Sequence, residues 1–278
     1  MAVQPVVKWI GGKRQLLPEI MENMPGAFDK DTATYFEPFL GGGAVLFGLS
    51  PNKAVVNDSN EELVNVYKVV RDSVDDLIEL LNDYPNELEF YNTIRALDRD
   101  SESFKNLPAV ERAARFIYLN KTCFNGLYRV NKKGQFNASF GKYKDPKICD
   151  EDTLRNVSSY LRKSEVELLT GDFEASVESA KQGDFVYFDP PYVPLTVTSS
   201  FTRYTSDGFD MDDQMRLRNL VDRLTGKGVF VMLSNSCSPA VEELYADYHV
   251  RVVQANRRVN TVGSGRGKIN EVLVTNYG

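Results

Sequence analysis

The strongest constraint on the fold is an alternation of strand and helix patterns at both ends of the chain. Near the N-terminus, the β-prone segments 34–39 and 53–58 are each followed by a helical pattern, at 41–49 and 61–70. Strand patterns return at 165–173, 185–188, 228–235, 248–255 and 269–277, with helices near 211–225 and 239–246. This alternation is typical of a doubly wound parallel sheet, so we predict an α/β protein.

Between these two stretches the alternation lapses. Residues 72–124 are helical in pattern, and the segment 127–137 is predicted to form a β-hairpin with Lys133 and Gly134 in its turn. We therefore expect one domain made of segments 1–71 and 160–278, interrupted by an inserted domain at 72–159.

The composition of the chain argues against several classes of protein. The chain has 278 residues and contains no apolar run of the length that a membrane helix needs, and its start lacks the pattern of a signal peptide. The three cysteines are isolated and His249 is the only histidine, which argues against a disulfide framework, a histidine-based metal site and a histidine-dependent triad. We expect a reduced, cytoplasmic protein.

The charge is unevenly distributed. The net charge of −6 argues against a nucleic-acid partner, but residues 121–147 carry seven basic residues against Asp145 alone, and 257–268 carry four with no acid. Each run on its own is equally compatible with a solvated loop. They indicate a nucleic-acid groove only if the fold brings them together.

A glycine-rich turn and an acidic residue follow the first two predicted strands. Gly41, Gly42 and Gly43 allow a tight turn and a close approach of the backbone to a ligand. Asp58 ends the second strand, where a carboxylate can accept hydrogen bonds from ribose hydroxyls, or can cap the helix at 60–70 instead. Together these features suggest an adenosine-containing ligand at the switch point of the sheet.

The segment Asp189-Pro190-Pro191-Tyr192 directly follows another predicted strand. The prolines have no N–H, so their carbonyls are available to accept hydrogen bonds, and Asp189 adds a carboxylate acceptor. Tyr192 supplies a ring for stacking. These groups suit the exocyclic amine of a nucleobase, although a rigid turn with a capping aspartate is the simpler alternative.

Taken together, the motifs "KWIGGK", "EPFLGGG", "VVNDSNEEL", "FNGLYRVN", "LTGDFE", "DPPY" and "FTRY" cover essentially the whole chain. Their order resembles that of the Dam-type (class α, D12 class) N6-adenine DNA methyltransferases, close to the GATC-methylating enzymes of the DpnII type. The resemblance implies a Rossmann-like sheet that binds S-adenosyl-L-methionine (AdoMet), with an inserted DNA-recognition domain of helices and a β-hairpin at 72–159.

The resemblance also implies site residues. Catalytic roles fall on Asp189, Pro190, Pro191 and Tyr192. AdoMet contacts fall on Trp9, Gly11, Gly12, Lys13, Glu37, Pro38, Phe39, Gly41, Gly43, Asp58, Asp172, Phe173 and Asp189. No metal is expected.

For DNA, the matching positions are Lys8, Phe124, Asn125, Leu127, Arg129, Asn137, Ser139 and Tyr143. Arg129 falls where the family recognises the first guanine of GATC. The chain departs from enterobacterial members at two positions, with phenylalanine in place of tyrosine at Phe124 and serine in place of proline at Ser139. Phe124 can still wedge into the base stack.

The implied reaction transfers a methyl group from AdoMet to adenine N6 of a flipped base in double-stranded DNA and leaves S-adenosyl-L-homocysteine. Adenine in RNA or in another sequence, cytosine N4, a non-catalytic nucleotide sensor and a nicotinamide oxidoreductase are the alternatives. We expect a monomer, bacterial or phage-encoded, associated with the nucleoid and not dependent on binding a cognate restriction endonuclease.

Overall fold

The computed structural model describes residues 3–192, 209–256 and 268–278. The chain divides into two compact units. The first unit comprises residues 1–12, 41–50 and 58–171, and the second comprises 13–40, 51–57 and 172–278. The motif "FTRY" at 201–204 and the basic run at 257–267 lie outside the described residues.

A seven-stranded sheet has the strand order β3-β2-β1-β4-β5-β7-β6. The pairs β1–β2, β1–β4 and β4–β5 are parallel, whereas β7 pairs antiparallel with both β5 and β6. The strands are β1 (Tyr35–Glu37), β2 (Lys53–Asp58), β3 (Glu165–Thr170), β4 (Phe185–Phe188), β5 (Phe230–Ser236), β6 (His249–Asn256) and β7 (Lys268–Thr275). The predicted α/β class is confirmed, and the predicted bounds of β2 match the structure. The sheet is mostly parallel, and the antiparallel pairing of β7 was not predicted.

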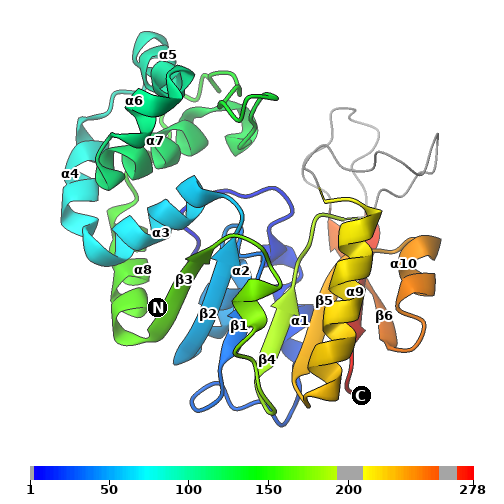
Figure 1. Cartoon of the computed structure of the whole chain (residues 1–278). Coiled ribbons are helices and arrows are strands. Elements are labelled where there is room, and N and C mark those ends of the chain that lie inside the picture. The colour runs from blue at the N-terminus through cyan, green and yellow to red at the C-terminus, as the bar shows by residue number, and fades with distance from the viewer. Residues whose placement is uncertain (1–2, 193–208, 257–267) are drawn as a thin grey trace. The chain divides into compact units, whose positions relative to one another are not determined.

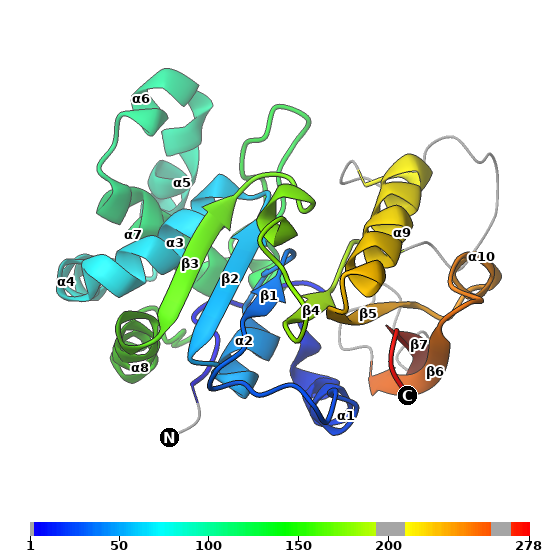
Figure 2. The same cartoon turned by 60° about the horizontal axis from the view of Figure 1, so that its bottom comes forward.

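In the second unit, strand β4 is buried on both faces, as its continuous apolar sequence predicts. Val186 and Phe188 pack into a core with α9 residues Leu217 and Leu220, while Phe185 contacts Phe28. Helices α9 and α1 lie on opposite faces of this part of the sheet (Figures 1 and 2). The helical segments of this unit are η1 (Lys13–Gln15), α1 (Leu17–Glu22), η4 (Ala175–Val177), α9 (Met211–Gly226) and α10 (Pro239–Leu244).

The first unit is mainly helical, and α7 is its central helix. Helices α3, α4 and α5 all pack against α7, whose residues from Ala113 to Asn120 are buried. The helices are α2 (Ala44–Leu49), α3 (Glu61–Asp72), α4 (Val74–Asp83), α5 (Leu88–Ala96), η2 (Leu97–Arg99), α6 (Ser101–Lys105), α7 (Ala109–Thr122), η3 (Phe124–Gly126) and α8 (Glu151–Lys163). The helical character predicted for 72–124 is confirmed.

The hairpin predicted at 127–137 is less regular than expected. Its two arms pair through one isolated bridge, Val130 to Phe136, rather than through a ladder. Backbone bonds from Asn131 to Gln135 and from Asn137 to Arg129 flank this bridge, and Asn131 Oδ1 also accepts from the backbone N–H groups of Lys133 and Gln135. Such local side-chain bonds compete with ladder pairing. The predicted turn at Lys133 and Gly134 is present.

Across the described ranges, the structure contains no helix with the length and apolar character needed to cross a membrane.

Candidate functional site

The carboxylate of Asp189 stands just beyond the C-terminal end of β4 in the second unit. Lys13 Nζ lies 2.8 Å from Asp189 Oδ1, and Ser234 Oγ donates to the same oxygen at 3.1 Å. Oδ2 has no partner among the residues that the structure describes. Burial raises the pKa of Asp189, and the ammonium of Lys13 opposes that rise. The carboxylate is therefore anchored through one oxygen and presents the other.

Ser234 belongs to a hydrogen-bonded chain that the sequence did not reveal. The hydroxyls of Tyr187 on β4 and Ser234 on β5 are 2.9 Å apart. An ionised carboxylate can only accept, so Ser234 donates to Asp189 and accepts from Tyr187. Burial holds the pKa of Tyr187 well above its usual value, which keeps its hydroxyl a donor. The only sequence signal was the polar run that ends β5 beside β4.

Tyr192 is held at two points. Its hydroxyl donates to Glu271 Oε2 at 2.6 Å, and Lys13 Nζ lies 4.7 Å from the centre of its ring. Glu271 belongs to β7 and was also missed by sequence reasoning, although an acid within the apolar pattern "INEVLVTNY" was a visible signal.

The two prolines of the motif differ in their carbonyls. The buried Gln214 of α9 donates its Nε2 to the Pro191 carbonyl at 3.1 Å. The Pro191 carbonyl therefore already accepts one hydrogen bond from the helix that covers β4. The Pro190 carbonyl has no hydrogen-bond partner within the described ranges.

A second group in the same unit surrounds Phe173. Phe39 stacks on Phe173 with ring centres 5.3 Å apart, and Arg216 lies over the Phe173 ring at 5.0 Å. Asp172 accepts from Arg216 Nη2 and from the backbone N–H of Glu174, both at 2.9 Å. Burial acts to raise the pKa of Asp172, but these hydrogen bonds outweigh it and the pKa is lowered.

Two further predicted cofactor residues of the second unit have polar contacts. Glu37, at the end of β1, is buried and accepts from the Tyr35 hydroxyl at 2.9 Å. The Pro38 carbonyl accepts from Asn57 Nδ2 at 3.0 Å. These bonds fix the backbone where β1 ends.

In the first unit, the glycine turn packs directly against Trp9. Gly41 has a φ of 50°, and a Cβ atom placed on it would come within 2.7 Å of the Trp9 indole. Gly43 has a φ of 69° and begins α2. Gly12 donates its N–H to the Trp9 carbonyl, while Gly11 has a φ of 75°. Glycine is needed at Gly41 both for the left-handed backbone and for space.

Asp58 binds this turn. Its Oδ2 accepts from the Gly41 N–H and its Oδ1 from the Asn60 N–H, both at 2.9 Å. The alternative in which Asp58 caps the following helix is wrong, because Asn60 caps α3 by accepting from the Leu63 N–H. Burial raises the pKa of Asp58 despite the two backbone hydrogen bonds.

The predicted DNA-binding residues gather around the loops that follow α7, also in the first unit. The backbone of Lys8 pairs with the side chain of Asn120, and the Lys8 ammonium lies 5.7 Å from the centre of the Tyr143 ring. The Tyr143 hydroxyl accepts from the N–H of Asn125, whose φ is 60°. These bonds tie the N-terminal segment to the loop.

Arg129 and Phe124 complete that surface. Arg129 donates from Nε to Asn137 Oδ1 at 2.7 Å and from Nη2 to the Asn137 carbonyl at 3.0 Å. Phe124 is 59% exposed and its N–H donates to the Ser139 carbonyl. The Leu127 carbonyl accepts from the Cys123 thiol. Phe124 and Arg129 are thus both exposed, as a surface that contacts a ligand requires.

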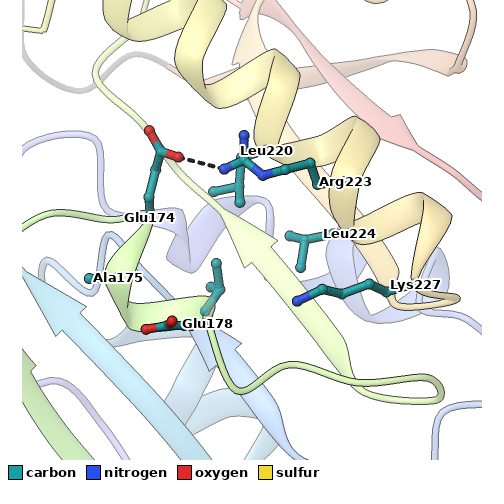
Figure 3. A pocket seen from close by; sticks show the side chains of 8 residues that line it. Glu174, Ala175, Glu178, Leu220, Arg223, Leu224 and Lys227 are labelled. Carbon is teal, nitrogen blue, oxygen red and sulfur yellow. Dashed lines mark hydrogen bonds and ion pairs between the residues drawn. The ribbon is translucent and has the colours of Figure 1, made fainter.

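A separate cavity of about 280 Å³ lies between η4 and α9 in the second unit (Figure 3). Its lining includes Glu174, Arg223 and Lys227, and Glu174 pairs with Arg223. None of the predicted site residues line it. Among the described residues no cluster of histidine, cysteine or acidic side chains could hold a metal ion.

Residues 9–259 match the model of the family described as D12 class N6 adenine-specific DNA methyltransferase. The chain is 50% identical to the type II methyltransferase M1.LlaDCHI of Lactococcus lactis subsp. cremoris, over 99% of this chain and 96% of that protein. It is 45% identical to the type II methyltransferase M.MjaIII of Methanocaldococcus jannaschii over both full lengths. It is 30% identical to the DNA adenine methylase of Escherichia coli K12, over 96% and 93% of the two chains. The chain belongs to the D12 class of N6 adenine-specific DNA methyltransferases.

Proposed function

We propose that this enzyme methylates adenine N6 within GATC in double-stranded DNA, after the target base has been flipped out of the helix. The observation that carries the proposal is the arrangement after β4. Asp189 is anchored through Oδ1, which leaves Oδ2 and the Pro190 carbonyl as acceptors beside the ring of Tyr192. Two acceptors and a ring suit an aromatic amine with two N–H donors.

In this proposal Asp189 Oδ2 and the Pro190 carbonyl accept the two N6 hydrogens, and Tyr192 stacks on the base. Both hydrogen bonds draw the amine nitrogen toward tetrahedral geometry, so that its lone pair points at the methyl group. The bound AdoMet supplies an electrophilic methyl group. The N–C bond forms as the S–C bond breaks, and the proton then leaves N6 for solvent. Positioning accounts for most of the acceleration.

The residues present fit AdoMet as the methyl donor, which membership of the family also implies. The proposal keeps the predicted contacts of Trp9, Gly11, Gly12, Gly41, Gly43 and Asp58 in the first unit, and of Lys13, Glu37, Pro38, Phe39, Asp172, Phe173 and Asp189 in the second. The support in the first unit is the glycine turn, which a Cβ on Gly41 would obstruct. Asp58 lies at the end of β2, where a carboxylate reaches ribose hydroxyls in folds of this type.

Recognition of DNA is proposed for segment 72–159. Arg129 keeps its Nη1 donors unengaged by described residues and would pair with the first guanine of GATC. Phe124 would wedge into the base stack, and the exposed Lys132, Lys133 and Lys144 would neutralise phosphates. Lys121 is a weaker candidate, because its side chain is partly buried.

We further propose that the enzyme acts as a cytoplasmic monomer that requires no bound endonuclease. Light scattering during size-exclusion chromatography, with and without a GATC duplex, tests the monomer.

A plasmid protection assay tests the proposed function. Unmethylated plasmid is incubated with the enzyme and labelled AdoMet, and then digested with endonucleases that cut either only unmethylated or only methylated GATC. Full protection from the first enzyme and full cutting by the second are expected. Label incorporated without protection of GATC would contradict the proposed sequence, and label recovered in cytosine would contradict the proposed base.

A further inference from the structure

The hydroxyl of Tyr192 is bound by a residue from a distant strand. Glu271 lies on β7, between Ser236 of β5 and Val253 of β6 in the register of the sheet. Its Oε2 accepts from the Tyr192 hydroxyl at 2.6 Å. A phenol bonded to a carboxylate at this distance is a charge-assisted hydrogen bond, which is stronger than a neutral one.

Glu271 is half-buried, and the next three residues of β7, Val272, Leu273 and Val274, are buried. A carboxylate that is partly removed from water is costly unless it is paired. Burial and the nearby carboxylates keep the pKa of Tyr192 well above its ordinary value, so the phenol remains protonated and able to donate. Glu271 and Tyr192 therefore satisfy each other.

Lys13 defines the other side of this arrangement. Its ammonium contacts the Asp189 carboxylate and lies over the Tyr192 ring, so it attracts both groups of the motif. Without a bond at the hydroxyl, the ring could turn about its side-chain torsions toward that ammonium. The bond to Glu271 holds the far end of the ring and so sets the plane that it presents.

We propose that Glu271 is a positioning residue for methyl transfer: it acts through the Tyr192 hydroxyl to fix the ring against which the target adenine stacks. This rests on the proposed function, because the ring matters only if a base stacks on it. In this proposal Glu271 acts only through the Tyr192 hydroxyl. Its effect should thus appear in the rate of the chemical step and should disappear when the hydroxyl is absent.

A double-mutant cycle tests the proposal with the full-length enzyme, AdoMet and a duplex that contains one GATC site. The variants are Glu271→Ala, Tyr192→Phe and the double variant, with Glu271→Gln as the conservative variant. Asn270→Ala is the matched control, since Asn270 is the preceding residue of β7 and is exposed. The measured quantities are the single-turnover rate constant, the KM for AdoMet and the denaturant midpoint of unfolding.

We expect Glu271→Ala and Tyr192→Phe each to lower the single-turnover rate about tenfold, the double variant to be no slower than either, and the KM for AdoMet to stay unchanged. Glu271→Gln should recover part of the rate because its amide oxygen still accepts. If Glu271→Ala slows the Tyr192→Phe enzyme as much as it slows the wild type, or raises only the KM, the proposal is overturned.

The unfolding cycle separates this inference from the proposed function. A non-additive shift of the denaturant midpoint reports the contact whether or not the enzyme methylates adenine. If the contact is present but the wild type leaves adenine unmethylated, the proposed function fails. If the wild type methylates adenine and the kinetic effects add, the role of Glu271 fails.

Discussion

The strand-end cluster of the second unit and the loop region of the first are held by different kinds of interaction. Asp189 and Tyr192 are fixed by Lys13, Ser234 and Glu271, which come from separate strands and a separate helical turn. In the loop region around Phe124 and Arg129, the hydrogen bonds are largely to backbone groups; some lie within 122–143, and others come from Tyr91 and Arg99 earlier in the first unit. A site that orients a reacting amine depends on the exact placement of its side chains, whereas a surface for DNA depends first on the path of its loops.

The largest expected effect is the loss of the carboxylate. Asp189→Ala removes one of the two proposed N6 acceptors and also the ion pair with Lys13. We expect the single-turnover rate of methyl transfer to fall by about a hundredfold to a thousandfold. Near wild-type transfer would show that the strand-end cluster does not orient the amine.

A substitution in the loop region should change the sequence specificity of methylation. Arg129→Ala is expected to cost ~1–3 kcal/mol of discrimination at the first guanine, roughly a tenfold to hundredfold change in the ratio of rates on GATC and a site altered at that base. The affinity for AdoMet should not change. Lys132→Ala is the control, because Lys132 is proposed to contact only phosphate. If Arg129→Ala instead lowers the methylation rate equally on all sites, Arg129 contacts phosphate and does not read the guanine.

A smaller effect is expected in the glycine turn. Gly41→Ala places a methyl group against the Trp9 indole in a left-handed backbone, and should lower the free energy of unfolding by about 1–3 kcal/mol. Gly26→Ala is the matched control, because nothing lies within 4 Å of its Cβ position and its φ is not positive. Equal midpoints of denaturant unfolding for the two variants would contradict the tight contact.

The smallest expected effect is a shift in the pH dependence of the single-turnover rate. The pKa of Asp189 is raised by burial, so the active, ionised carboxylate is lost as pH falls through a value above that of an ordinary aspartate. Lys13→Met removes the opposing ammonium, and the acid limb of the single-turnover rate should move to higher pH. A limb that stays in place in the variant would mean that another group controls it.

Much of the fold and part of the candidate site could be predicted from local sequence patterns. The continuous apolar run Phe185–Phe188 predicts a strand buried on both faces, and β2 has the predicted bounds. The motif at Asp189–Tyr192 pointed to an amine receptor, and the D12 family match bears out the methyltransferase reading. The predicted roles of the single residues remain proposals.

Other features could not be predicted, because they depend on which side chains meet in space. Nothing near Pro191 indicates that Gln214 satisfies its carbonyl. Asp58 was a candidate cap for the following helix, but Asn60 caps α3, and Asp58 accepts from the Gly41 N–H in another part of the first unit. The predicted hairpin forms only one isolated bridge, and the bonds that Asn131 Oδ1 accepts in its turn could not be ranked against strand pairing from the sequence.

By itself, the amino-acid sequence determined the alternation of strands and helices and the groups available at the end of β4, because these follow from local periodicity and from the chemistry of a few adjacent residues. Only the tertiary structure decided which oxygen of Asp189 is anchored, which proline carbonyl is taken and what holds Tyr192. Those outcomes depend on Lys13, Gln214, Ser234 and Glu271, which lie far away in the chain and reach the motif through helix packing and strand order.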